Sequence, residues 1–112
     1  MKLLIVEDNA GMRNMMKELF EPLFAQIFEC EDGSKALGAY KKNKPDWVFM
    51  DIKMKGMNGI AATEEIMKNF PDARILMVTD LNDEDLKKAA AESGAVNYVL
   101  KENLDEIFSI IK

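Results

Sequence analysis

The sequence predicts an α/β fold in which five strands form one parallel, doubly wound sheet and each strand precedes a helix. Two observations support this fold class: five short apolar runs recur at regular intervals, and an amphipathic helical pattern follows each of them. Such alternation is typical of parallel sheets with right-handed crossovers. The expected strand order is 2-1-3-4-5, as in (βα)5 flavodoxin-like folds. Residues 1–112 fit a single domain.

The five apolar runs are the predicted strands. They comprise residues 3–6, 27–30, 47–50, 75–78 and 98–100. The first, third and fourth runs contain only apolar residues, which is typical of strands that helices cover on both faces. Trp47 begins the third strand at the end remote from Asp51, so we expect it in the core rather than at a site.

The first two helices are indicated by apolar stripes and turn residues. The first stripe has i, i+3, i+4, i+7 spacing and consists of Met12, Met15, Met16, Leu19, Phe20 and Leu23. We expect this stripe to pack against the sheet, although a methionine-rich face also suits an adaptable partner surface. The second helix opens at Asp32-Gly33.

The last three helices have recognisable ends. Asn58-Gly59 opens the third helix, and the fourth runs over about residues 83–93 before Gly94, a suitable C′ glycine. Asn103 is expected to be the N-cap of the fifth helix. The apolar stripe of that helix consists of Leu104, Ile107, Phe108 and Ile111.

Charge and composition exclude several classes of function. The formal net charge is −5, so the chain lacks the basic face that a nucleic-acid binder uses to neutralise phosphates. An acidic domain suits protein partners and metal cations better. The apolar run at the N-terminus is too short for a signal peptide or a membrane span, so no membrane insertion is expected.

Two residue types limit the chemistry further. Cys30 is the single cysteine, so no internal disulfide forms; we expect it to be buried, and the chain to reside in the reducing cytoplasm. Histidine is absent. Catalytic triads, histidine metal ligands and phosphohistidine chemistry are therefore excluded within this chain, which leaves carboxylates, hydroxyls and amines.

Three carboxylates follow two strands that the expected order places side by side. Glu7 and Asp8 follow the first strand, and Asp51 follows the third. Ligands bind open α/β sheets at the carboxyl ends of the strands, where the strand order switches. Three acids at one point repel one another unless a cation lies among them. The sequence therefore predicts a site for a hard cation, and Mg²⁺ is the natural candidate.

The other strand ends carry a hydroxyl and an amine. Thr79 follows the fourth strand and Lys101 the fifth. A hydroxyl donor and an ammonium group at the same sheet edge suit a phosphoryl group. Each residue alone has an ordinary alternative, since threonine favours strands, lysine is usually solvated and acids cap helices. Their joint placement indicates a site.

These motifs carry a resemblance that covers essentially the whole chain. The segments are residues 4–9 (LIVEDN), 48–54 (VFMDIKM), 56–59 (GMNG), 78–79 (VT) and 97–101 (NYVLK). In this order and at this spacing, the chain resembles the receiver domain of two-component response regulators, including the stand-alone chemotaxis type.

The resemblance implies a role for each site residue. Asp51 would be the phosphoacceptor. Glu7, Asp8, Asp51 and the backbone carbonyl of Lys53 would hold Mg²⁺. Lys101 would pair with the phosphoryl oxygens.

The resemblance also implies a switch and partners. Thr79 would bind the phosphoryl oxygens and Tyr98 would follow inward, although Tyr98 also suits an ordinary half-buried strand position. The donor would be a sensor histidine kinase or a phosphotransfer protein, and the changed surface would bind a downstream protein target. The domain would be a monomer or weak dimer. It would assist its own phosphorylation and dephosphorylation without being a turnover enzyme.

Four positions depart from the family pattern. Glu7 stands where many members carry aspartate. Glu102 follows Lys101 where the family usually has a proline with a cis peptide bond, so we expect a trans bond here. Lys55 replaces another common proline and is expected to be solvated. Asp80 replaces a small residue and is expected at the surface, with a modest effect on the lifetime of the phosphorylated state.

Three other functions remain open. Asp80 and Glu102 favour a receiver-like interaction domain that acts without phosphorylation. A metal-dependent hydrolase with Asp51 as nucleophile would need a further acid or base and a lid, for which no insertion is long enough. A nucleotide- or flavin-binding domain would need a glycine-rich phosphate loop, which is absent.

Overall fold

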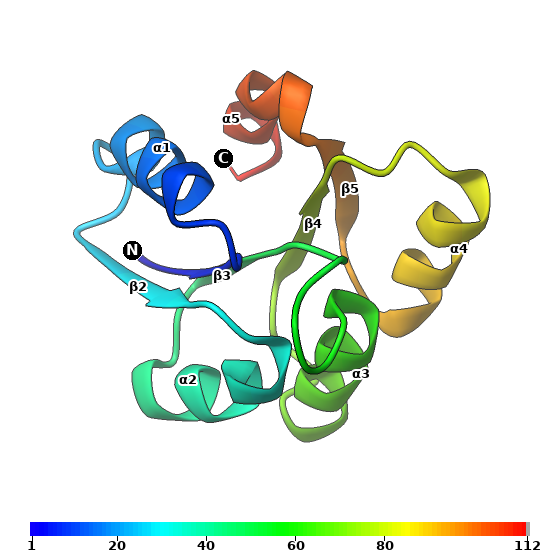
Figure 1. The fold of residues 1–112 in the computed structure, drawn as a ribbon. Helices are drawn as coiled ribbons and strands as arrows, with labels where there is room; N and C mark the ends of the chain where they lie inside the picture. The colour runs from blue at the N-terminus through cyan, green and yellow to red at the C-terminus, as the bar shows by residue number, and fades with distance from the viewer. Residues whose placement is uncertain (112) are drawn as a thin grey trace.

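A computed structural model describes residues 1–111 and contains the five strands and five helices that the sequence predicts (Figure 1). The strands are β1 (Lys2–Val6), β2 (Gln26–Cys30), β3 (Trp47–Met50), β4 (Ile75–Thr79) and β5 (Asn97–Leu100). The helices are α1 (Ala10–Phe20), α2 (Ala36–Asn43), α3 (Gly59–Asn69), α4 (Glu84–Ser93) and α5 (Ile107–Ile110). Short 3-10 segments precede α2 (Gly33–Lys35) and α5 (Lys101–Glu106).

The sheet has the predicted parallel order, β2-β1-β3-β4-β5. Val6 lies opposite Met50 at the carboxyl ends of β1 and β3. The pairing continues one residue further, because the Asp51 N–H donates to the Val6 carbonyl at 3.0 Å. Glu7 and Asp51 therefore follow strands that are neighbours and end level with each other, at the switch in strand order.

Helices cover both faces of the sheet, as the unbroken apolar strands predict (Figure 1). On one face, α1 and α5 pack on side chains such as Ile5 and Phe49. On the other face, α2, α3 and α4 pack on Val6 and Met50. Full burial of such a side chain contributes about 1.5–3 kcal/mol, so the two cores hold the strand ends in fixed positions.

Side-chain caps start the helices that flank the site. Asn9 Oδ1 accepts from the Met12 N–H at 2.8 Å, and Asn58 Oδ1 accepts from the Ala61 N–H at 2.9 Å. Each cap satisfies a backbone donor that a helix start leaves free. Gly59 lies so close to the strand end that a Cβ there would be 1.8 Å from the Asp51 carbonyl oxygen. Glycine at this position thus allows α3 to begin directly beside Asp51.

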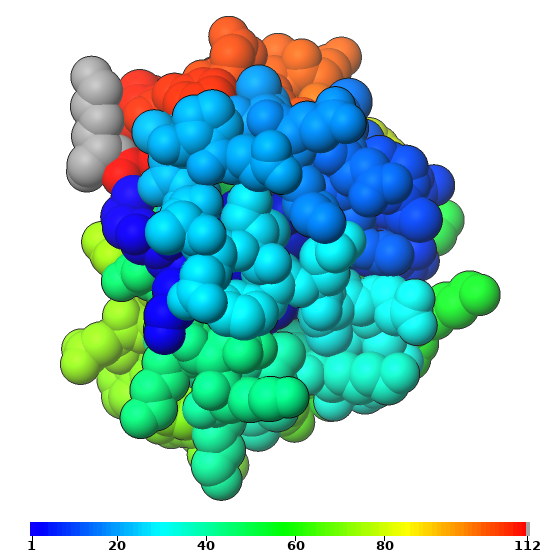
Figure 2. Space-filling model, turned by 90° about the vertical axis from the view of Figure 1, so that its left-hand side faces the viewer, coloured from blue at the N-terminus to red at the C-terminus, as the bar shows by residue number. Residues whose placement is uncertain are grey.

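The first helix differs from its prediction on one side. Met16 and Phe20 are buried, whereas Met15, Leu19 and Leu23 are 46%, 38% and 39% exposed. The expectation that the whole stripe packs against the sheet is wrong for these three residues. One helix face buries only a narrow strip against a sheet, and Met15 lies at the pocket instead of in the core. Figure 2 shows α1 at the surface next to the C-terminal residues.

The fifth helix also begins later than predicted. Asn103 is not an N-cap; it lies inside the 3-10 segment, with φ −124° and ψ 39°, and α5 itself starts at Ile107. The chain leaves β5 with Lys101 held in the pocket, and asparagine tolerates the kink that this turn needs. The Lys101–Glu102 peptide bond is trans, as predicted.

Other expectations agree with the structure. Gly94 ends α4 with φ 109°, Trp47 and Cys30 are buried, and Lys55 is exposed. Within residues 1–111, no helix has the length and apolar character that crossing a membrane requires.

Candidate functional site

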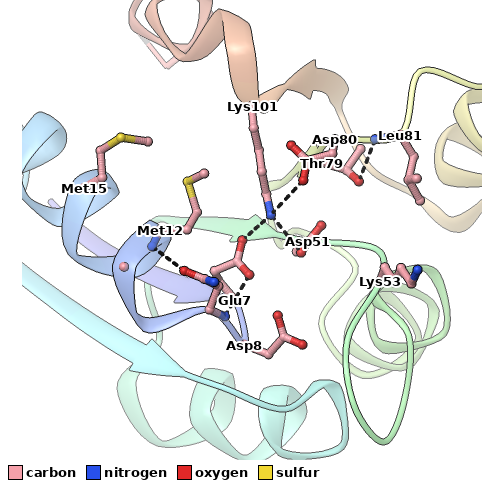
Figure 3. A pocket seen from close by; sticks show the side chains of 12 residues that line it. Glu7, Asp8, Met12, Met15, Asp51, Lys53, Thr79, Asp80, Leu81 and Lys101 are labelled. Carbon is pink, nitrogen blue, oxygen red and sulfur yellow. Dashed lines mark hydrogen bonds and ion pairs between the residues drawn. The ribbon is translucent and has the colours of Figure 1, made fainter.

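A pocket of about 600 Å³ opens at the carboxyl edge of the sheet, where the sequence predicts the site (Figure 3). Its lining residues come from the ends of β1, β3, β4 and β5 and from the first turns of α1. They are Glu7, Asp8, Asn9, Gly11, Met12, Met15, Asp51, Lys53, Thr79, Asp80, Leu81 and Lys101. The four strand ends therefore deliver the predicted acids, hydroxyl and amine to one cavity.

Three carboxylates converge in this pocket. One carboxylate oxygen from each of Glu7, Asp8 and Asp51 lies within 4.8 Å of the others. Glu7 is 1% exposed and Asp51 5%, while Asp8 is more open to solvent. Hard oxygen donors at this separation fit a divalent cation such as Mg²⁺.

Lys101 supplies the positive charge that the structure places among these acids. Its Nζ lies 2.6 Å from Glu7 Oε1, 3.1 Å from Asp51 Oδ2 and 4.0 Å from Asp80 Oδ2. The Lys101 side chain is only 9% exposed, so its contacts with the buried Glu7 and Asp51 are shielded from water, whereas the Asp80 side chain is 77% exposed. Removing one partner of a buried ion pair costs far more than removing an exposed one.

The same contacts shift two ionisation equilibria. Burial raises the pKa of Glu7, and the hydrogen bond from Lys101 opposes this rise only in part. Burial by itself lowers the pKa of Lys101, but its bond to Glu7 and the charge of Asp51 outweigh burial and raise that pKa. Lys101 is therefore firmly cationic, and Glu7 is the carboxyl that protonates more readily than usual.

Leu81 links Thr79 to Tyr98 through two hydrogen bonds. The Leu81 N–H donates to the buried Thr79 Oγ1 at 3.3 Å. The Tyr98 O–H donates to the Leu81 carbonyl. Tyr98 is half-buried, and burial raises the pKa of its phenol. A displacement of the Thr79 hydroxyl is thus coupled to the Tyr98 side chain through Leu81.

Backbone and side-chain donors hold the two buried carboxylates in place. The Asn9 N–H donates to Glu7 Oε2 at 3.1 Å, and the Ile52 N–H donates to Asp51 Oδ1 at 2.8 Å. Arg13 donates from its guanidinium to the Glu7 carbonyl at 2.7 Å. These donors fix the carboxylates before any ligand binds, which is the preorganisation that charge-stabilising sites need.

Some of these residues were missed by sequence reasoning. Arg13 lies four residues after the Asn9 cap, in the first turns of the helix that follows Glu7. This position indicates that its side chain can reach the site. The pocket contacts of Met12, Met15 and Leu81 had no such signal.

The remaining predicted residues lie at the rim or outside it. Lys53 lines the pocket, but its side chain is exposed and points away from the carboxylates (Figure 3). Asp80 is at the surface as expected, with its side chain 77% exposed. Trp47 lies at the opposite end of the sheet, where the Arg74 guanidinium stacks 4.9 Å above its ring.

Comparison with known proteins identifies relatives of this chain. The family model of the response regulator receiver domain matches residues 3–112. The chemotaxis protein CheY of Halobacterium salinarum is 39% identical over 100 residues, which cover 89% of this chain and 83% of that protein. The sporulation initiation phosphotransferase F of Bacillus subtilis is 31% identical over 112 residues, covering 99% and 90%.

Solved structures agree with the sequence comparison. The crystal structure of a CheX–CheY–BeF3–Mg²⁺ complex from Borrelia burgdorferi matches with a TM-score of 0.90 and 28% identity, covering 99% of this chain and 89% of that one. The response regulator domain of Thermotoga maritima CheB matches with a TM-score of 0.83 and 32% identity, covering 92% and 79%.

Proposed function

This chain belongs to the response regulator receiver domain family, and we propose that it accepts a phosphoryl group on Asp51 in a Mg²⁺-dependent reaction. The observation that carries the proposal is the position of Asp51. Its carboxylate is buried beside Glu7 and Asp8 and is in contact with Lys101, at the floor of an open pocket. A nucleophilic carboxylate with an adjacent cation suits phosphoryl transfer.

The chain's own residues divide the work of the transfer. Glu7, Asp8, Asp51 and the backbone carbonyl of Lys53 would hold Mg²⁺, which would neutralise charge that develops on the transferred group. An Asp51 oxygen forms the bond to phosphorus as the bond to the donor breaks. Lys101 exchanges its contacts with the acids for contacts with the phosphoryl oxygens, and the fixed Ile52 N–H keeps Asp51 oriented.

We propose that Thr79 and Tyr98 carry the signal to the surface. When the Thr79 hydroxyl moves to donate to a phosphoryl oxygen, it moves away from the Leu81 N–H, and the Leu81 carbonyl that holds Tyr98 shifts with the loss of that bond. Phosphorylation biases a two-state equilibrium in this way. The changed surface, formed by α4, β5 and α5, binds a downstream protein target.

This chain has no histidine, so a phosphohistidine donor must be another protein. We propose that the donor is a histidine kinase or phosphotransfer protein, and that the transfer takes place in the cytoplasm. We infer that the domain assists its own phosphorylation and dephosphorylation without steady turnover of a substrate. It acts as a monomer or weak dimer, and its net charge of −5 disfavours direct contact with nucleic acid.

The test is intact-mass measurement after incubation with a small phosphodonor. Wild type should gain a single phosphoryl adduct with Mg²⁺ and none with a chelator, and Asp51→Asn should gain none. Circular dichroism confirms that this variant is folded. An unlabelled wild type, under conditions that label a known receiver, would instead support a receiver-like domain that binds partners without phosphorylation. Sustained hydrolysis of a phosphate ester would support a hydrolase.

A further inference from the structure

We propose that Asp80 sets the donor preference of this pocket: its carboxylate disfavours donors whose leaving group departs as an anion, and so favours phosphorylated nitrogen over acyl phosphates. The inference rests on the proposed function, since it concerns the phosphoryl group that Asp51 accepts. It goes beyond that function because it assigns the choice of donor chemistry to one residue of this chain.

Asp80 stands on the solvent side of the pocket. It directly follows Thr79, which is 1% exposed, yet its own side chain is 77% exposed. Its Oδ2 lies 4.0 Å from Lys101 Nζ, and both residues line the cavity. Asp51 is buried, whereas the exposed Asp80 lines the same pocket from the end of β4, with Lys101 in reach of both carboxylates (Figure 3).

The geometry of the transfer brings the leaving group past Asp80. In phosphoryl transfer the attacking and leaving atoms lie roughly in line on opposite sides of phosphorus. Asp51 attacks from the floor, so the leaving group departs through the mouth. As the bond between Asp51 oxygen and phosphorus forms, the bond to the donor breaks and its electron pair leaves with the donor atom.

Donors differ in the charge that this electron pair produces. Acetyl phosphate releases acetate, which carries one negative charge. Phosphoramidate, whose nitrogen is already protonated, releases neutral ammonia, and a protonated phosphoimidazole likewise releases neutral imidazole. A carboxylate at the mouth therefore repels the leaving group of the first donor and not that of the other two.

The charged groups of the pocket determine how strongly Asp80 repels the leaving group. The pocket lining contains four carboxylates (Glu7, Asp8, Asp51, Asp80) and two lysines (Lys53, Lys101), which gives a net charge of −2 before a cation binds. A Mg²⁺ ion held by the three deeper acids would bring this sum to zero, so Asp80 then acts through its own charge at the mouth rather than through the net charge of the pocket. Lys101 is shared among acids deeper in the pocket, and the Lys53 side chain points away. A solvated charge at this range changes a rate on the order of three- to tenfold, and salt screens the effect.

The experiment compares two small donors, so that docking of a partner protein plays no part. Phosphorylation rates of wild type and Asp80→Asn are measured by intact mass with acetyl phosphate and with phosphoramidate, at saturating Mg²⁺ and fixed ionic strength. We expect the variant to react about three- to tenfold faster with acetyl phosphate and to change less than about twofold with phosphoramidate. Asp80→Glu should retain the wild-type preference, and about 1 M salt should shrink the difference.

Two controls separate donor selection from other effects. Asp72→Asn removes an exposed carboxylate in the loop between α3 and β4, outside the pocket, and should leave both rates unchanged. Calorimetric titration with Mg²⁺ alone should give the same affinity for Asp80→Asn and wild type. An altered metal affinity that accounts for the faster rate would overturn the inference.

The outcomes distinguish this inference from the function it rests on. An equal change with both donors, or no change with either, refutes a role for Asp80 in donor choice while phosphorylation of Asp51 stands. Failure of both donors to label wild type refutes both proposals.

Discussion

Replacing Lys101 by methionine removes the ammonium group and keeps most of the aliphatic stem. Glu7 and Asp51, which are 1% and 5% exposed, then lie in the pocket without their cation. Loss of one partner from a buried pair typically costs about 3–5 kcal/mol. The variant can relieve part of this repulsion by taking up a proton, and Glu7 is the site, because burial already raises its pKa.

The loss of stability cannot exceed the free energy needed to protonate Glu7, because the variant can bind a proton instead of keeping that carboxylate charged. Protonating a carboxyl with the ordinary pKa of 4.5 costs about 4 kcal/mol at pH 7.5 and about 1.4 kcal/mol at pH 5.5. The folded state binds this proton more tightly than the unfolded chain, so stability rises as pH falls through the raised pKa toward 4.5. We therefore expect Lys101→Met to lose about 3–4 kcal/mol at pH 7.5 and no more than about 1.4 kcal/mol at pH 5.5.

The assay is urea denaturation followed by circular dichroism, in chelator, at both pH values. Lys53→Met serves as the matched control, because it removes an exposed ammonium from the same pocket and should change stability by less than about 0.5 kcal/mol. Equal destabilisation of Lys101→Met at the two pH values would refute the role of Glu7 protonation. An unchanged stability at pH 7.5 would refute the buried ion pair itself.

Two further substitutions test the geometry around the site. Gly59→Ala places a Cβ 1.8 Å from the Asp51 carbonyl oxygen, so we expect a loss of about 1–3 kcal/mol in urea denaturation and slower phosphorylation; wild-type behaviour in both would contradict the close approach. Tyr98→Phe removes the O–H that donates to the Leu81 carbonyl, and should cost about 0.5–1.5 kcal/mol while the adduct on Asp51 still forms. Loss of that adduct would instead place Tyr98 in the chemistry.

The convergence of the acids could be predicted because it depends on topology alone. Parallel strands end at one edge of the sheet, so the order β2-β1-β3-β4-β5 is sufficient to bring Glu7 and Asp51 together. The choice of Lys101 as their partner follows from the same rule, because it comes directly after β5. The strand order and these placements need no knowledge of individual side-chain contacts.

The errors arise where neighbouring elements decide the outcome. Exposure of Met15 and Leu19 depends on how α1 is rotated against the sheet, and spacing along one helix does not contain that information. Asn103 has the composition of an N-cap, but the chain around it must first place Lys101 in the pocket. The contact from Arg13 to the Glu7 carbonyl likewise depends on backbone positions that only the folded chain fixes.

The position of Trp47 makes this protein convenient for spectroscopy. It is the single tryptophan, is 5% exposed, and lies beneath Arg74 at the sheet end opposite the pocket. Its indole emission should therefore follow global unfolding and remain nearly constant when the pocket binds a cation or Asp51 is modified. Fluorescence thus measures stability independently of occupancy of the site, and an occupancy signal requires a second tryptophan introduced near the pocket mouth.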